Sequence, residues 1–223
     1  MTSYYSRKLA GRRLERCYEI AAPRVQRYFE AEIVHALSRI RPTDSVLELG
    51  CGTGRIARRV ADVAARVVGI DTAAESIACA RETVHAPNCV FMEMDALHLG
   101  FPNDSFDVVL CLQNGICAFR LDTASLIKEA LRVTRPGGRV LFSSYADAFW
   151  EHRLAWFDAQ AAEGLVGPVD HAASMDGVIV CTDGFRAGRM TPAGFQELCA
   201  KVGVAGEVTE VDESSVVCEV RKG

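Results

Sequence analysis

The 223-residue chain lacks any long apolar run, and no apolar segment follows its first charged residues. No stretch approaches the roughly 18 apolar residues of a membrane-spanning helix. The start, Met-Thr-Ser-Tyr-Tyr-Ser-Arg-Lys, therefore does not resemble a secretory signal. Internal repeats and low-complexity linkers are absent as well. These absences predict a cytoplasmic protein without a membrane partner, and the length suits one α/β domain.

A surplus of positive charge is also missing. The chain has 25 Lys and Arg against 29 Asp and Glu, a formal net charge of −4. Proteins that bind nucleic acid usually present a basic face, so this balance disfavours a nucleic-acid partner. Only residues 7–16 carry a local basic bias. The expected partner is a small-molecule substrate, and the protein is expected to be a monomer or a homodimer.

The cysteines lack the spacing of a metal site. There are nine of them, no Cys-x-x-Cys occurs, and the closest pair, Cys111 and Cys117, does not have metal-ligand spacing. In a reducing cytoplasm cysteines remain free thiols, and free cysteine is among the most buried residue types. We therefore expect no metal site and mostly buried thiols.

The most informative segment is residues 46–56, Val-Leu-Glu-Leu-Gly-Cys-Gly-Thr-Gly-Arg-Ile. An apolar strand carrying Glu48 is followed by three alternating glycines, and Arg55 begins a helix. A strand that leads through glycines into a helix N-terminus is how α/β proteins hold nucleotide-like cofactors. The segment therefore predicts a cofactor site.

The spacing of the glycines indicates which cofactor is bound. The dinucleotide fingerprint Gly-x-Gly-x-x-Gly/Ala is met only from Gly52, through Ala57. Glu-x-Gly-x-Gly-x-Gly fits better and resembles the first motif of the class I S-adenosylmethionine-dependent methyltransferases. The resemblance implies S-adenosyl-L-methionine as cofactor and S-adenosyl-L-homocysteine as product. The cofactor-binding residues that it implies here are Glu48, Gly50, Cys51, Gly52 and Gly54.

Alternating strand and helix signals surround this loop. Strand segments lie at 46–49, 66–70, 90–94, 106–112 and 139–144, and helical periodicity at 55–65, 73–84 and 123–132. Repeated β–α units build a parallel sheet with helices on both faces. Together with the resemblance, the pattern predicts an α/β fold, a Rossmann-like, doubly wound, mostly parallel seven-stranded sheet that closes with an antiparallel β-hairpin.

Carboxylates stand where the predicted strands end. Asp71 follows the second strand at about the distance of an acidic ribose partner from the glycines. It could also cap the next helix or be a solvated strand end, although we expect Thr72 to be that cap. Thr72, beside Asp71, is also expected at the cofactor. Asp95, followed by Ala96, is either an adenine contact or a turn cap. Glu48 either orients the cofactor's amino group, directly or through water, or fixes the loop.

The fourth strand ends in Leu112-Gln113-Asn114-Gly115. This neutral segment suits the neighbourhood of a sulfonium, and the resemblance places Leu112 and Gln113 at the cofactor. It is not the Asn-Pro-Pro-Tyr type of motif found in N-methyltransferases of DNA or protein amides. The departure disfavours those substrates. The resemblance covers residues 40–145 strongly and 191–220 less specifically.

Two regions outside the cofactor core are expected to cover it. They are an N-terminal helical extension, residues 1–40, and a lid-like insertion after the fifth strand, residues 146–190; the core spans 41–145, and 191–223 form a closing helix and hairpin. Tyr18 and Tyr28 are the aromatic residues expected to touch cofactor or substrate. The other aromatic candidates, each also explained by helix packing, are Tyr4, Tyr5, Trp150, Trp156 and Phe157.

A general base is sought in the insertion. His171, beside Asp170, and His152 are the candidate catalytic residues, since histidine titrates near neutral pH. Both are also compatible with a surface position. Arg186 and Arg189 either hold an acidic substrate or are solvated.

The sequence thus predicts S-adenosylmethionine-dependent methyl transfer to the O, N or S atom of a small molecule, by in-line displacement. The alternative is an RNA or protein methyltransferase. A metalloid or thiol methyltransferase and a non-catalytic nucleotide-binding protein remain as further readings.

Overall fold

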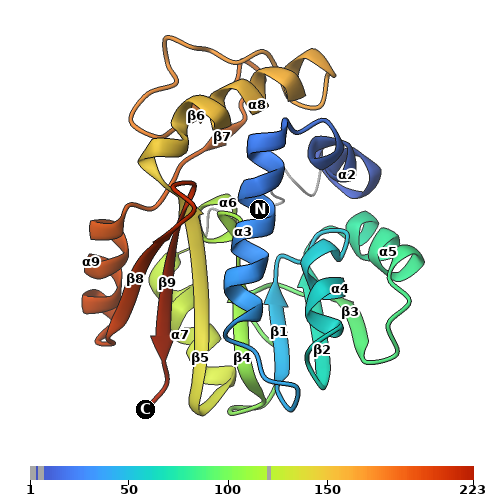
Figure 1. The fold of residues 1–223 in the computed structure, drawn as a ribbon, viewed down its shortest axis with the longest axis vertical. Helices are drawn as coiled ribbons and strands as arrows, with labels where there is room; N and C mark the ends of the chain where they lie inside the picture. The colour runs from blue at the N-terminus through green and yellow to red at the C-terminus, as the bar shows by residue number, and fades with distance from the viewer. Residues whose placement is uncertain (1–3, 5–7, 120–121) are drawn as a thin grey trace.

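The computed structural model describes residue 4, residues 8–119 and residues 122–223. In this part of the chain seven strands form one sheet in the order β3-β2-β1-β4-β5-β9-β8 (Figure 1). The first five strands pair in parallel, and β9 runs antiparallel to both β5 and β8. The predicted fold class is confirmed. The strand bounds are β1 (Ser45–Leu49), β2 (Arg66–Asp71), β3 (Cys89–Glu93), β4 (Phe106–Cys111), β5 (Thr134–Tyr145), β8 (Gly206–Val211) and β9 (Ser215–Arg221).

Helices cover both faces of this sheet, which explains why β1 and β4 are apolar on both sides. One apolar cluster joins one face to helices that include Ile33, Val60 and Ile77. Another joins the opposite face to helices that include Leu126 and Phe195. The first face carries α3 (Pro23–Leu37), α4 (Arg55–Ala61) and α5 (Ala74–Thr83), and the second carries α6 (Gly115–Ala118), α7 (Thr123–Val133) and α9 (Pro192–Val202).

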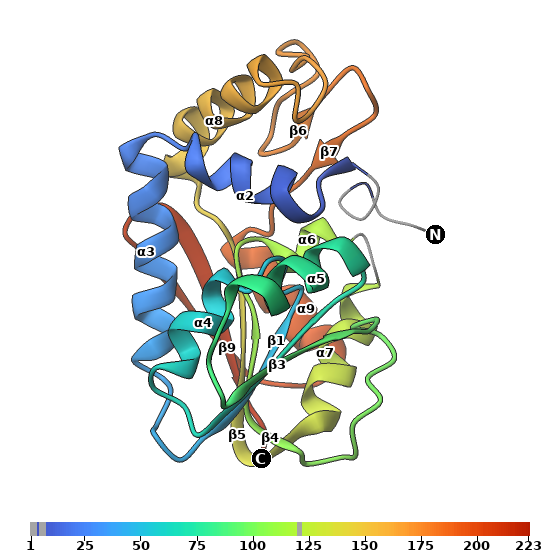
Figure 2. The ribbon, with the colours of Figure 1, turned by 90° about the vertical axis from the view of Figure 1, so that its right-hand side faces the viewer.

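A cover lies across the carboxyl ends of the parallel strands. Figure 2 shows α8 and the β6–β7 ribbon above these ends, with α2 between α8 and the sheet. A third apolar cluster holds the cover together, and Trp156 of α8 donates its indole N–H to the carbonyl of Cys17 on α2 at 2.8 Å. The cover consists of α2 (Gly11–Glu19), the first turns of α3, η1 (Asp147–Phe149), α8 (Trp150–Ala162), β6 (Ile179–Val180) and β7 (Arg186–Ala187).

The structure corrects two local predictions and adds one short helix. The N-cap of α5 is Ala73 and not Thr72, because the carboxylate of Asp71 already accepts from the Ala73 N–H at 2.8 Å. Strand β5 begins at Thr134, before the predicted start at residue 139, and Gly137, whose φ is 76°, lies inside the strand. Helix α6, which follows β4, was not predicted, because four residues are too few to show a helical pattern in the sequence.

Candidate functional site

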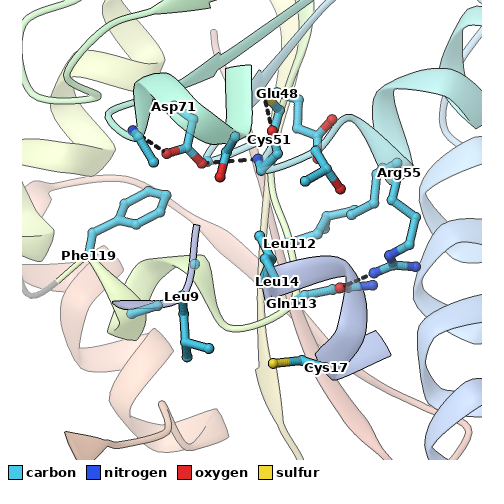
Figure 3. Close-up of a pocket in the computed structure, with 18 of the residues that line it drawn as sticks. Leu9, Leu14, Cys17, Glu48, Cys51, Arg55, Asp71, Leu112, Gln113 and Phe119 are labelled. Carbon is cyan, nitrogen blue, oxygen red and sulfur yellow. Dashed lines mark hydrogen bonds between the residues drawn. The ribbon is translucent and has the colours of Figure 1, made fainter. Parts of the chain in front are cut away.

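A cavity of about 610 Å³ lies between the carboxyl ends of β1, β2 and β4 and the cover. This volume is in the range of small-molecule sites. Figure 3 shows Asp71 and Phe119 on one side of it and Arg55 with Gln113 on the other. The cavity brings together every predicted cofactor residue except Gly54. Those that line it are Tyr18, Tyr28, Glu48, Gly50, Cys51, Gly52, Asp71, Thr72, Asp95, Ala96, Leu112 and Gln113.

The glycine loop is held by the end of β2. Gly50 and Cys51 both donate their N–H groups to the carbonyl of Ile70, at 2.8 and 2.9 Å. Gly50 has a φ of 71°, and a Cβ there would lie 2.5 Å from the ring of Phe119. Only glycine allows this backbone shape and the close approach of the ring. Phe119 was not predicted, because its contact with the loop is purely tertiary.

Gly54 serves packing and not the cavity. Its φ is 82°, and it stands at the N-terminal end of α4. A Cβ at this position would meet the ring of Phe91 at 2.8 Å and Val84 at 3.0 Å. The third glycine of the motif therefore lets α4 approach β3 closely, behind the loop that faces the cavity.

Asp71 ties the glycine loop to the start of α5. One carboxylate oxygen accepts from the N–H of Gly52 at 3.0 Å, and the other accepts from Ala73 at 2.8 Å. Burial raises the pKa of Asp71, and these hydrogen bonds oppose that rise. Since a carboxylate has about four lone-pair sites, Asp71 keeps acceptor capacity toward the cavity.

Glu48 is a buried carboxyl group at the end of β1. Burial raises its pKa to about 8, and the positive charge of Arg55 offsets part of that rise. Its Oε2 has no hydrogen-bond partner among the described residues. A buried polar atom without a partner costs stability, so a bound donor there would be favourable.

Arg55 and Gln113 face Glu48 across the cavity. The guanidinium of Arg55 donates to the side-chain oxygen of Gln113 and packs over the rings of Tyr18 and Phe29, at 4.4 and 4.7 Å from their centroids. Within the described chain, Arg55 Nε and Gln113 Nε2 are buried without hydrogen-bond partners. The acceptor on one side and the donors on the other match the ammonium and carboxylate of an amino-acid zwitterion. The residues therefore fit the tail of S-adenosylmethionine.

Asp95 caps its own turn. Its Oδ1 accepts from the N–H of Leu97 at 2.9 Å, and its Oδ2 lies 3.5 Å from Nδ1 of His98. Ala96 is buried beside it in the cavity wall. The turn-capping interpretation is thus correct, and it also presents a small apolar residue to the cavity.

A buried carboxylate that the sequence analysis missed joins the cover to the strand ends. Glu32 of α3 is 1% exposed and accepts from the N–H of Gln113 at 2.9 Å and from the hydroxyl of Ser143 at 2.9 Å. It also accepts from the hydroxyl of Ser215. Burial raises its pKa against these hydrogen bonds. The available signal was an acidic residue inside the apolar stripe of α3, next to Ile33.

The same junction strains the backbone after β4. Gln113 and Asn114 both have positive φ, 51° and 64°, which is uncommon for residues other than glycine. Asn114 accepts from the hydroxyl of Ser144 at 2.7 Å and donates to the carbonyl of Gly188 at 3.0 Å. Hydrogen bonds to the sheet and to the insertion thus hold the segment that carries Gln113 into the cavity.

The two candidate bases do not join the cavity. The side chain of His171 is 57% exposed, and its Nε2 lies 3.0 Å from Oδ1 of Asp158 rather than pairing with Asp170. His152 is exposed on α8 and packs beside Phe149. Arg189 pairs with Asp147, and Trp150 lies with them at a second, more open cavity under the insertion.

Among the other aromatic candidates, Trp156 and Phe157 line the cavity. Tyr4 instead packs edge-on against Phe185, and its hydroxyl donates to Asp183. Tyr5 lies outside the described residues.

The nine cysteines are free, and seven are buried, as predicted. Within the described ranges, no group of His, Cys, Asp or Glu has the geometry to hold a metal ion. In the same ranges, no helix is long and apolar enough to span a membrane.

Comparisons with known proteins agree with this geometry. The family model described as "Methyltransferase domain" matches residues 46–138. The chain is 33% identical over 102 residues to the malonyl-[acyl-carrier protein] O-methyltransferase of Yersinia pestis, over 46% of this chain and 37% of that protein. It is 34% identical over 122 residues to the 2-methyl-6-phytyl-1,4-hydroquinone methyltransferase of Synechocystis sp., over 51% of this chain and 38% of that protein.

The chain thus spans little more than a third of the length of either curated relative. A solved structure covers it more fully. The DhpI–SAM–HEP complex superposes with a TM-score of 0.66 at 25% sequence identity, over 99% of this chain and 100% of that one. Residues 46–138 match the methyltransferase domain, and the sheet order agrees with the class I S-adenosylmethionine-dependent methyltransferases. We call the part of the cavity formed by the glycine loop with Glu48, Arg55, Asp71 and Gln113 the cofactor corner.

Proposed function

We propose that this protein transfers the methyl group of S-adenosylmethionine to a small-molecule acceptor. The observation that carries the proposal is the set of unpartnered buried atoms around the glycine loop: Glu48 Oε2, Arg55 Nε and Gln113 Nε2. Glu48 Oε2 can accept a hydrogen bond from an ammonium, and Arg55 Nε and Gln113 Nε2 can donate to a carboxylate, all within one cavity. The methyltransferase names of the relatives support the same reaction type.

In this proposal each part of the cofactor has a place. Glu48 binds the ammonium of the tail, while Arg55 and Gln113 bind its carboxylate. Asp71 accepts hydrogen bonds from the ribose hydroxyls, since charge-assisted bonds to a carboxylate are strong. Asp95 and Ala96 border the adenine.

When bound, S-adenosylmethionine supplies an electrophilic methyl group: the acceptor's lone pair forms the new bond to carbon, the carbon–sulfur electrons return to sulfur, and a protonated acceptor also loses a proton. The chain's contribution is alignment, which can lower the barrier by several kcal/mol. The rings of Tyr28, Trp156 and Phe157 close the cavity and exclude water.

The cavity's tyrosines and Cys17 act as donors and not as bases. Burial raises the pKa of Tyr18, Tyr28 and Tyr145, to about 12 for Tyr145, and raises that of Cys17 to about 12. These groups stay protonated at neutral pH. They orient an acceptor by hydrogen bonds, and the acceptor's own acidity governs the release of its proton.

Calorimetric titration with S-adenosylhomocysteine tests the proposal. We expect saturable binding, clearly weakened in Glu48→Ala and unchanged in the surface control His171→Asn. Absence of binding at millimolar ligand would overturn the proposed function. Retained binding in Glu48→Ala would remove Glu48 from the tail site while leaving the cofactor in place.

A further inference from the structure

The part of the cavity under α8 differs from the cofactor corner. We call it the aromatic chamber. Its wall comes from α2, α3, the end of β5 and α8, so residues far apart in sequence meet here. The residues that define it are Cys17, Tyr18, Tyr28, Phe29, Tyr145, Trp156, Phe157 and Gln160.

The rings of the aromatic chamber hold one another in place. The Tyr28 centroid lies 5.3 Å from that of Phe29 and 5.3 Å from that of Tyr145, and Phe29 lies 5.3 Å from Trp156. These separations are those of attractive aromatic pairs. Trp156 is fixed further by the hydrogen bond from its indole N–H to the backbone carbonyl of Cys17. The wall is therefore preorganised to pack a flat apolar molecule at little ordering cost.

One polar atom of this wall lacks a partner. Tyr28 is fully buried, and its hydroxyl lies near that of Tyr145 but makes no hydrogen bond of normal geometry within the described chain. The side-chain amide of Gln160 donates one long hydrogen bond, 3.4 Å, to the Trp156 carbonyl of its own helix. The polar groups of the chamber wall are thus the hydroxyls of its three tyrosines, the thiol of Cys17 and the amide of Gln160, and the rest of the wall is apolar.

Charge stays at the chamber's edges. Arg55 packs over Tyr18 and Phe29 at the border with the cofactor corner, and Arg153 packs behind Tyr145, 4.2 Å from its centroid. An ammonium in the chamber would lie beside this positive charge, and the buried carboxyl of Glu32, near Tyr28 and Tyr145, already accepts hydrogen bonds from Gln113, Ser143 and Ser215. A carboxylate would have to leave water for a wall of rings, which costs several kcal/mol unless it is paired.

We propose that the aromatic chamber selects the methyl acceptor, and that the acceptor is an uncharged aromatic alcohol of the phenol class whose hydroxyl meets that of Tyr28. This inference rests on the proposed function and adds the acceptor's chemistry. A phenolic hydroxyl suits the site because it ionises near pH 10, as tyrosine does. Such an acceptor needs less help from a base than an aliphatic alcohol does.

Matched probes test the acceptor class in the protein saturated with S-adenosylhomocysteine. The probes are 2-naphthol, its non-aromatic analogue decahydro-2-naphthol, 2-naphthoate and 2-naphthylmethylammonium, each titrated by calorimetry. We expect 2-naphthol to bind at least tenfold more tightly than the other three. Tighter or equal binding of 2-naphthoate or of the ammonium would overturn the proposal.

Two variants test whether 2-naphthol binds in the aromatic chamber, and a third serves as their control. Tyr28→Phe should weaken 2-naphthol binding about fivefold, the value of one hydrogen bond, while 2-naphthoate stays weak. Trp156→Leu should weaken it further, and Trp150→Leu, on the same helix but outside the chamber, should not. Equal affinities in all three variants would contradict the chamber as the site. Failure of S-adenosylhomocysteine itself to bind would overturn the proposed function instead, which the first titration detects separately.

Discussion

The cofactor corner and the aromatic chamber share one cavity but are built in different ways. The corner consists of strand ends and a glycine loop, with functional groups such as Glu48 and Asp71 placed by single strands. The chamber consists of rings from four elements that meet only when the chain has folded. The corner offers charge and backbone, and the chamber offers flat apolar surface. The difference separates a site for a fixed cofactor from one whose occupant can vary between relatives.

Glu32 joins the two regions, and its loss should have the largest effect. Glu32→Ala removes three hydrogen bonds and leaves the buried hydroxyl of Ser143 without an acceptor, while Gln113 and Ser215 keep only their bonds to Ser143 Oγ and to the Ser144 carbonyl. We expect the free energy of unfolding to fall by about 4 kcal/mol, measured in urea. Glu32→Gln should recover part of the loss. A stability equal to that of the unmodified protein would show that corner and cover fold independently.

Glu48 makes the stability of the corner depend on pH. Burial raises its pKa from 4.5 to about 8, so the folded protein binds the proton more tightly than the unfolded chain. The contribution of this group to the free energy of unfolding is therefore fully present below pH 4.5 and is lost as the pH rises toward 8. Through this group the ligand-free protein should lose about 3 kcal/mol between pH 4 and pH 7. Thermal unfolding should show this slope, and Glu48→Gln should remove it. An unchanged slope in the variant would assign it to other carboxyl groups.

Cofactor binding at pH 7 should also release a proton, because an ammonium favours the ionised form of Glu48. Calorimetry in buffers of different ionisation enthalpy measures that proton. The Glu48→Gln variant serves as the control without release.

Asp71 tests the corner alone. Asp71→Ala should weaken the binding of S-adenosylhomocysteine by about 1.5–3 kcal/mol, the range of hydrogen bonds to a charged group. Binding of 2-naphthol to the chamber should stay within twofold once the cofactor site is saturated. Equal losses for both ligands would mean that the two regions are one coupled site.

The smallest effects belong to the two histidines. His152→Ala and His171→Ala change exposed side chains outside the cavity, so stability should change by less than about 0.5 kcal/mol. The affinity for S-adenosylhomocysteine should not change. A large loss of turnover with a bound acceptor would show that the insertion moves a histidine into the cavity.

The corner could be predicted because its signals are local. The alternation of strands and helices fixes where each strand ends, and the ends of parallel strands share one edge of the sheet. The positions of Asp71 and Asp95 at the cavity follow directly. Gly54 is the exception, since packing against Phe91 gives the same glycine signal as contact with a ligand.

The chamber could be predicted only in part: Tyr18, Tyr28, Trp156 and Phe157 were candidates for the cover, and the contacts that bring the other residues to the site are tertiary. Nothing in the sequence near Glu32 or Phe119 shows what they contact across the fold. The prediction that His171 acts as a base beside Asp170 failed for the same reason. A neighbouring Asp170 in sequence does not decide which way the imidazole faces, and the structure pairs it with Asp158 on α8.

A crystal structure with S-adenosylhomocysteine and 2-naphthol tests the central claim most directly. We expect the amino-acid tail to lie between Glu48 and Arg55, the ribose at Asp71, and the sulfur to face the naphthol ring in the aromatic chamber. A cofactor bound with its sulfur turned away from Tyr28 and Trp156, or a naphthol bound outside the chamber, would contradict it.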